Sequence, residues 1–377
     1  MTTRVAVLLG MLCLTAGGAS RAAPVERADA EEDDDGGGVH WLLERTHLST
    51  LMFLHYGGGE QGGERFNKFY VSRGYLTLKL EPLRWFHTRA TVDVYEDDDG
   101  WELRFKYIYG RFIAPLETAV VSRPMVEFGL VHVPWLSYEE EINRYRMQGT
   151  MFLERAGLFN SADLGVTVGT LLGRPLSEED QERSSPHFPG TWGSISAGLY
   201  NGGGYHGAEL NRSKALAARI SVRPLGAWAP MLQVSYLLVY GKGNVESAPD
   251  WDLHGAFASF ESRYLVVTGQ YARGRGSQNG KNLDRDGEAV GFQGASGFTE
   301  LRWPAVGAAL FGRYDWLRRD ADADDSAPET SGRLIAGLAY FFFRDCGLVV
   351  DVDHLWWLDT DQPDEWEVKL TMQIALP

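Results

Sequence analysis

The side chains of this sequence that could do chemistry are charged residues that alternate with large apolar ones. Residues 101–109 read Trp-Glu-Leu-Arg-Phe-Lys-Tyr-Ile-Tyr, so Glu102, Arg104 and Lys106 stand at every second position. Because successive side chains of a β-strand point to opposite faces, these charges share one face, and the residues between them, Tyr107 included, share the other. Such a strand can place water and ions on one side and lipid on the other.

A channel wall selects solutes by its width and by the sign of its charges. Several strand-like segments carry cations on their charged face. One long connection, residues 134–161, carries both positive and negative charges. The candidate channel-lining residues are Lys79, Arg89, Arg104, Lys106, Arg219, Arg223, Arg313 and Lys369 on strands, and Arg144, Arg146, Arg155, Glu139, Glu140 and Glu141 on the connection. Any hydrated surface needs mixed charges, so a preference for anions or for cations stays open.

Residue sets typical of enzymes and metal sites are poor by comparison. The nine histidines are scattered, and none stands in a Cys/His cluster with zinc-binding spacing. His254 could pair with Ser259 or Ser262, but no third member of a triad is identifiable. Residues 282–287 resemble a calcium loop, yet Gln293 replaces the closing glutamate. We therefore predict no enzymatic activity, no metal site and no other cofactor.

The N-terminus indicates export. Arg4 precedes a twelve-residue apolar run, Val5 to Ala16, and small residues follow up to Ala22. This order is typical of a cleaved signal peptide, which we place at residues 1–22; an uncleaved anchor is the alternative. Residues 23–48 are acidic and glycine-rich and are predicted to form a flexible periplasmic leader. The net charge of -15 argues against nucleic acid as a partner.

The alternation of apolar and polar residues recurs along the remainder of the chain, residues 49–377. It is clear at residues 76–80, 216–222 and 366–376. A soluble β-sandwich also alternates, but aromatic residues at strand ends are typical of transmembrane barrels, which carry aromatic girdles at both interfaces. Aromatic packing in a core is the alternative. The aromatic residues in question are Tyr70, Tyr75, Trp85, Trp101, Tyr109, Trp303, Trp316, Trp356, Trp357 and Trp366.

The connections between these segments alternate between short and long, as in outer-membrane barrels with short periplasmic turns and long outer loops. Counting alternating segments of ~10 residues predicts a transmembrane antiparallel up-and-down β-barrel of about sixteen strands. The expected strands start near Ser49, Lys68, Phe86, Trp101, Met125, Asp163, Ser194, Ala215, Met231, Leu253, Leu265, Phe292, Val306, Gly332, Leu348 and Trp366. A barrel of this size encloses a water-filled channel.

Two connections stand out. Residues 134–161 lack clean alternation, and they form the third outer loop if the first strand runs outward. Residues 173–193 are long and charged, yet the same parity places them in the periplasm. They are either an insertion at that end or a sign that the count is wrong by one strand.

The middle of the chain resembles the phosphate-selective porin O/P family. The resemblance rests on residues 127–135 (Glu-Phe-Gly-Leu-Val-His-Val-Pro-Trp), 151–155 (Met-Phe-Leu-Glu-Arg) and 164–166 (Leu-Gly-Val), and extends to 195–202 and 217–224. It implies that a strand with a Pro-aromatic ending precedes an inward-folded constriction loop. In the anion-selective members, lysines and arginines line that constriction, whereas this loop also holds acidic residues.

These patterns lead us to expect a porin in the outer membrane of a Gram-negative bacterium. It would pass small hydrophilic solutes, with anions such as phosphate as one option. Its expected partners are outer-membrane lipid and lipopolysaccharide, and the family likeness implies a homotrimer. The alternative is a barrel that serves as a structural or adhesive surface protein without an open pore.

Overall fold

A computed structural model describes residues 35–97, 100–205, 207–320, 328–358, 360 and 362–377. The predicted signal peptide lies outside these residues. Part of the predicted leader is described: Asp35–Glu44 form the helix α2, and the chain up to Glu44 is a unit separate from the barrel. No helix in the described ranges is long and apolar enough to cross a membrane.

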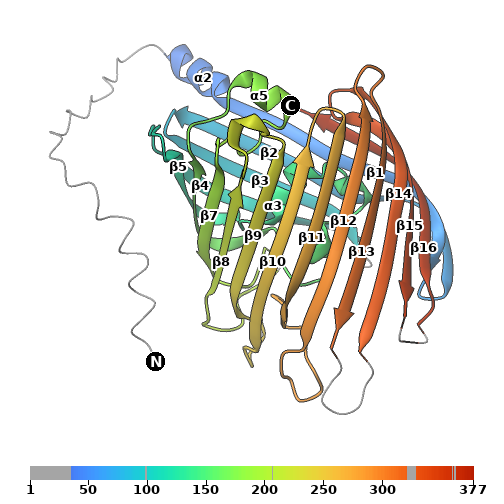
Figure 1. The fold of residues 1–377 in the computed structure, drawn as a ribbon. Coiled ribbons are helices and arrows are strands. Elements are labelled where there is room, and N and C mark those ends of the chain that lie inside the picture. Colours follow the sequence, from blue (N-terminus) through green and yellow to red (C-terminus); the bar gives the residue numbers. More distant parts are fainter. Residues whose placement is uncertain (1–34, 98–99, 206, 321–327, 359, 361) are drawn as a thin grey trace. The chain divides into compact units, whose positions relative to one another are not determined.

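The described part of Arg45–Pro377 forms a closed antiparallel barrel of sixteen strands (Figure 1). The strands are β1 (Thr46–Gln61), β2 (Glu64–Leu83), β3 (Phe86–Asp97), β4 (Gly100–Ile113), β5 (Val121–His132), β6 (Ala162–Leu172), β7 (Gly193–Tyr200), β8 (Ala215–Val222), β9 (Leu232–Lys242), β10 (Asp250–Glu261), β11 (Leu265–Arg275), β12 (Gly291–Trp303), β13 (Ala308–Arg319), β14 (Glu329–Phe343), β15 (Cys346–Trp357) and β16 (Glu365–Leu376).

Each strand pairs with its neighbours in sequence, and β1 pairs with β16 from Thr50↔Leu376 to Glu60↔Trp366. Closure leaves no unpaired strand edge, which is the condition for a sheet to sit in lipid. The predicted fold class and strand number are confirmed. Every predicted start lies within four residues of the observed one, because the two-residue period is a property of each strand by itself.

The two ends of the barrel differ in their connections. β1 begins and β16 ends at one end, which we call the termini end, and there the connections are short, such as Arg344–Asp345 between β14 and β15. The opposite end, which we call the loop end, carries several longer connections, although only Gly62 and Gly63 join β1 to β2 there. Residues 173–192 lie at the termini end and contain the helix α5 (Glu178–Arg183) (Figure 1). They are therefore an insertion at that end, and the strand count is correct.

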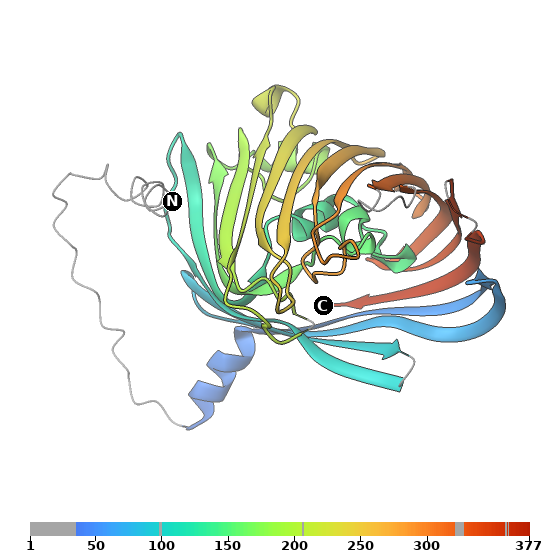
Figure 2. The same cartoon turned by 90° about the horizontal axis from the view of Figure 1, so that it is seen from below.

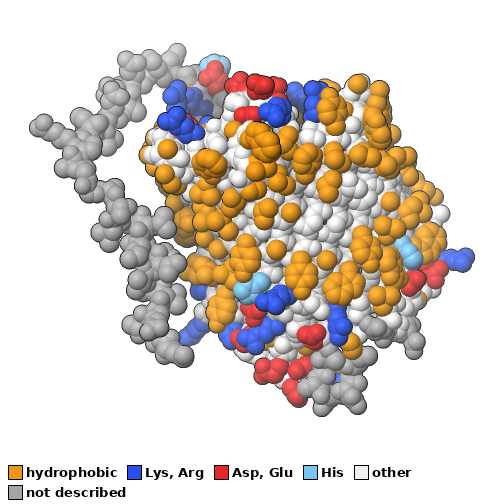
Figure 3. Space-filling view, in the orientation of Figure 1, with side chains coloured by type: hydrophobic (Ala, Val, Ile, Leu, Met, Phe, Trp, Pro, Cys, Tyr) orange, Lys and Arg blue, Asp and Glu red, His pale blue; other side chains and the backbone are white. Residues whose placement is uncertain are grey.

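The outer surface of the barrel is apolar between two charged rims. Figure 3 shows hydrophobic side chains over β8 to β13, with charged residues gathered towards both ends. Trp85, Trp101, Trp303 and Trp366 are exposed on this outer surface, as expected of a girdle. The expectation is wrong for Tyr75 and Tyr109, which are buried and line the interior.

A β-bulge in β4 changes which residues face outward. Thr91 pairs with Tyr107 and Val92 pairs with Phe105, so Lys106 is the extra residue of the bulge. Leu103 and Phe105 are exposed, and Arg104 and Lys106 point inward, as predicted. Tyr107 was predicted to face lipid, but it is buried in the lumen, 4% exposed, because the bulge shifts the alternation by one residue.

Candidate channel constriction

The connection between β5 and β6, residues 133–161, folds into the barrel. It contains the helix α3 (Leu136–Ile142), a 3-10 turn (Arg146–Gln148) and the short helix α4 (Phe152–Arg155). The view along the barrel shows these elements inside the ring of strands (Figure 2). This connection is the third at the loop end, and we call it loop 3. The predicted inward-folded third loop is therefore present.

Aromatic packing holds loop 3 against one side of the lumen. Trp135 and Tyr138 at the start of the loop pack edge-on against Phe257 of β10, with ring centroids 5.5 and 6.1 Å apart. Tyr145 stacks on Phe311 of β13 at 4.0 Å. All five rings are almost fully buried, so loop 3 is packed like a protein core on this side.

Polar contacts tie loop 3 to the same wall. Arg144 donates from Nε and Nη2 to Glu300 Oε1 on β12, at 3.0 and 2.7 Å. Arg313 of β13 and Lys369 of β16 donate to backbone carbonyls of the loop, Thr150 and Gln148, at 2.9 Å each. Arg155 donates to Gln148 Oε1 and lies 3.9 Å from Asp353. These four predicted lining cations are thus engaged in holding loop 3.

The acidic residues of loop 3 have three different environments. Glu139 is buried and accepts a hydrogen bond from Trp135 Nε1 at 2.9 Å, and burial raises its pKa to about 7. Glu140 pairs with Arg146 at 3.0 Å. Glu141 accepts from His187 of the termini-end insertion at 2.9 Å. Of these three predicted lining acids, Glu139 is buried beside Trp135, whereas Glu140 and Glu141 line the larger cavity described below.

Most of the other predicted cations are also engaged. Arg104 binds the buried Asp93 at 3.0 Å. Lys106 lies near the rings of three tyrosines, the nearest being Tyr75 at 4.9 Å. Arg219 donates to the carbonyl of Pro134 at 2.8 Å, at the start of loop 3.

Arg223 does not line either of the two lumen cavities described below. It donates to the carbonyls of Pro230 and Gly190 at 2.9 and 2.7 Å. It therefore joins two connections at the termini end. Arg223 follows the last residue of β8, and its guanidinium is held by backbone carbonyls of neighbouring turns, so its lining role stays a prediction.

Two cavities lie between loop 3, the insertion at the termini end and the wall formed by the first strands. The larger has a volume of about 610 Å³ and the smaller about 270 Å³. Lys79 of β2 and Arg89 of β3 line both. Arg89 donates to Thr91 Oγ1 at 2.9 Å and lies 3.3 Å from His132 Nε2. In the described part of the chain, neither cation forms an ion pair with an acid.

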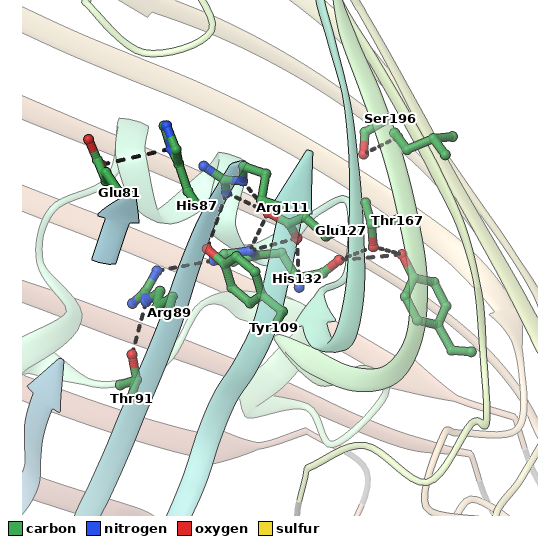
Figure 4. A network of polar contacts seen from close by, with 12 residues as sticks. Glu81, His87, Arg89, Thr91, Tyr109, Arg111, Glu127, His132, Thr167 and Ser196 are labelled. Carbon is green, nitrogen blue, oxygen red and sulfur yellow. Dashed lines mark hydrogen bonds and ion pairs between the residues drawn. The ribbon is translucent and has the colours of Figure 1, made fainter. Parts of the chain in front are cut away.

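A polar network on β4 and β5 was missed by the sequence analysis. Arg111 donates to the fully buried Glu127, whose second oxygen lies 3.0 Å from His132 Nδ1 (Figure 4). Tyr109 and Thr167 lie beside this network. A carboxylate with apolar neighbours on both sides, as Glu127 has in Val126 and Phe128, was the available signal, because buried carboxylates need partners.

The residues considered for catalysis or metal binding do not form a site. His254 pairs with Tyr236 on the outward face of β10, whereas Ser259 of the same strand is buried on the inward face. Ser262 belongs to the turn after β10, and its hydroxyl donates to the backbone carbonyl of Leu265. Within the calcium-like segment, Asp284 accepts from the backbone of Asp286 and Glu288. No metal-binding cluster of acids, histidines and cysteines exists in the described ranges.

Comparison with known proteins shows similarity at the level of fold. No protein-family model and no curated protein matches the sequence. OmpF of Salmonella typhi, in complex with daunomycin, aligns with a TM-score of 0.58 at 12% identity, over 87% of this chain and 97% of its own. A loop-deletion mutant of OmpT, an outer-membrane protein of Vibrio cholerae, aligns at 0.55 and 11%, over 87% and 99%. The outer-membrane channel DcaP of Acinetobacter baumannii aligns at 0.53 and 11%, over 88% and 97%.

Proposed function

We propose that this protein is an outer-membrane porin of a Gram-negative bacterium, through which small hydrophilic solutes diffuse. The observation that carries the proposal is loop 3, which lies inside the ring of strands and packs against one side of the lumen. A sixteen-stranded barrel is wide enough to hold an aqueous channel, and a folded segment within it sets the width and charge of the passage. The apolar outer surface and the closed strand pairing support a position in lipid.

We infer a solute path between loop 3 and the wall of the first strands, because the two cavities lie there. Arg73, Lys79, Arg89, Arg104 and Lys106 stand on β2 to β4, and loop 3 presents Glu140 and Glu141 towards them. Opposite charges across a narrow passage produce a transverse field that acts on ions more strongly than charges at an exposed rim do. Transport of anions such as phosphate stays a proposal that rests on the sequence resemblance alone.

Single-channel recording in planar bilayers tests the function. The purified protein should give stepwise conductance. Replacing residues 136–158 by a short Gly/Ser linker should raise that conductance about twofold or more, because the linker widens the passage. Replacing residues 243–249, between β9 and β10, by a short Gly/Ser linker is the control and should leave conductance close to the original. A closed barrel without conductance steps would favour the alternative of a structural surface protein.

The charges of loop 3 can be tested in the same recordings. Replacing Arg146 and Arg155 with Ala should shift the zero-current potential in a salt gradient towards cations, because Glu140 loses its partner and Asp353 keeps only Arg333. If conductance and selectivity both stay unchanged, loop 3 is not the constriction.

We also propose a homotrimer, with lipid and lipopolysaccharide around it. The support is the trimeric form reported for OmpT of Vibrio cholerae, which shares the fold at 9% identity. Light scattering in mild detergent tests this proposal, and a monomer mass would contradict it.

A further inference from the structure

Lys79 and Arg89 stand directly opposite each other on neighbouring strands. Lys79 of β2 is the register partner of Arg89 of β3. Like charges at directly opposed positions repel and destabilise a sheet. Other cations of the lumen wall do form ion pairs: Arg104 pairs with Asp93, and Arg111 pairs with Glu127. Neither of these opposed cations forms an ion pair with an acid in the described ranges, so a bound counter-charge would relieve the repulsion between them.

The smaller cavity brings more positive charge to this pair. Its lining includes Arg219 from β8, and Arg219 has no acidic partner within the described ranges either. The guanidinium of Arg219 is held in place by the carbonyl of Pro134 and the hydroxyl of Ser194, at 2.8 and 3.0 Å. The cavity is thus lined by cations from β2, β3 and β8.

The three acids of this cavity already have partners of their own. Glu127 accepts from Arg111 and His132, and Glu141 accepts from His187. Glu81 lies 3.8 Å from His87 (Figure 4). Glu81 and Glu141 act on Lys79 only at longer range, and none of the three acids forms an ion pair with Lys79 or Arg89 in the described ranges.

We propose that Lys79, Arg89 and Arg219 form a binding subsite for a small dianion with carboxylate or phosphate oxygens. A guanidinium presents a fork of donors that matches such oxygens, and an ammonium adds a point charge. The volume of about 270 Å³ admits a small solute and no large one. A bound dianion would replace the repulsion between Lys79 and Arg89 by two favourable contacts. The site deepens the proposed porin function, since its ligand would arrive through the channel.

Calorimetric titration of the purified full chain in detergent tests the subsite. Succinate and inorganic phosphate are the two probes, and saturable binding of either supports the proposal and tells which oxygens are preferred. The double variant Lys79→Gln/Arg89→Gln should bind the preferred anion at least about tenfold more weakly, because two charge-assisted hydrogen bonds are lost.

The matched control is Arg333→Gln. It removes one lumen cation that already pairs with Asp353 at 2.6 Å, so binding should stay within about twofold of the unchanged protein. Binding of neither anion to the unchanged protein overturns the proposal, as does equal binding by the double variant.

A measurement on the unchanged protein covers the case in which the double variant does not fold. Acetylation of Lys79 by a small amine reagent, followed by mass spectrometry, should slow at least about threefold when the preferred anion is present, because a bound oxyanion shields the amine. Lys68, exposed on the same strand, is the internal reference and should react at an unchanged rate. Equal rates at Lys79 with and without anion contradict the subsite.

Channel recordings separate the two proposals. Conductance without anion binding would remove the subsite and leave the porin. Anion binding without conductance would remove the porin function and leave the subsite.

Discussion

Glu300 of β12 is a fully buried carboxylate that organises three side chains around it. It accepts from Arg144, from the hydroxyl of Tyr145 at 2.9 Å and from Arg302 at 2.8 Å. Two of these partners belong to loop 3. One carboxylate is therefore the shared counter-charge of two arginines and also fixes the position of the loop.

Glu300→Gln should make the channel more selective for anions, because Arg144 and Arg302 lose their counter-charge. We expect a shift of the zero-current potential towards anions and a loss of about 1–3 kcal/mol in stability, since both arginines are partly exposed to water. Glu329→Gln is the control. Its carboxylate pairs with Arg319 near the loop end, where water screens the charge, so the potential should move less. Equal shifts would show that Glu300 does not act inside the passage.

The insertion at the termini end, residues 173–192, contacts loop 3. Phe188 packs against Tyr138 with ring centroids 5.4 Å apart, and His187 pairs with Glu141. Neither His187 nor Glu141 lies on a membrane-spanning strand. Burial alone would lower the pKa of His187, but the hydrogen bond and charge of Glu141, with the charges of Glu261 and Asp345, raise it above 6.5.

The pH dependence of this contact follows from both shifts. The pKa of Glu141 is lowered from 4.5: burial alone would raise it, but the hydrogen bond and charge of His187 outweigh burial, helped by His132 and Lys79. The stabilisation by Glu141 is present above 4.5 and is lost as the pH falls through its lowered pKa. The stabilisation by His187 is present below 6.5 and is lost as the pH rises through its raised pKa. The contact is therefore strongest between these limits.

Hydrogen exchange of residues 184–190, corrected for intrinsic rates, should be faster at pH ~9 than at pH ~6, because His187 loses its charge in between. His187→Gln should show similar exchange at both values. A pH effect of the same size in the variant would assign the change to another group.

Barrel closure is the property on which the whole molecule depends. β16 pairs with both β15 and β1, so its removal would expose two strand edges. Unpaired backbone groups cannot be satisfied in lipid. Deleting residues 365–377 should therefore abolish membrane insertion and conductance, whereas deleting residues 24–34 should leave both intact. Stable insertion of the first variant in lipid vesicles would show that closure does not need β16.

Strand positions and the direction of most side chains could be predicted from the sequence. Leu216 and Val368 face outward and Arg219 and Lys369 face inward, as their alternation indicates. The place of loop 3 also followed from the parity of the connections. The alternation failed at Tyr107, because a single extra residue at Lys106 reverses the faces without changing the local composition.

The sequence by itself determined the barrel, because each strand shows the two-residue alternation of apolar and polar side chains. Sixteen such strands in succession are enough to close a barrel. The tertiary structure decided which charges are neutralised. Lys369 meets the carbonyl of Gln148 and Arg144 meets Glu300 only after the barrel closes around loop 3, and these partners lie 221 and 156 residues apart in the sequence. Lys79 and Arg89 remain without an acid for the same reason. Charge pairing in a lumen depends on distances across it, and no local pattern records those distances.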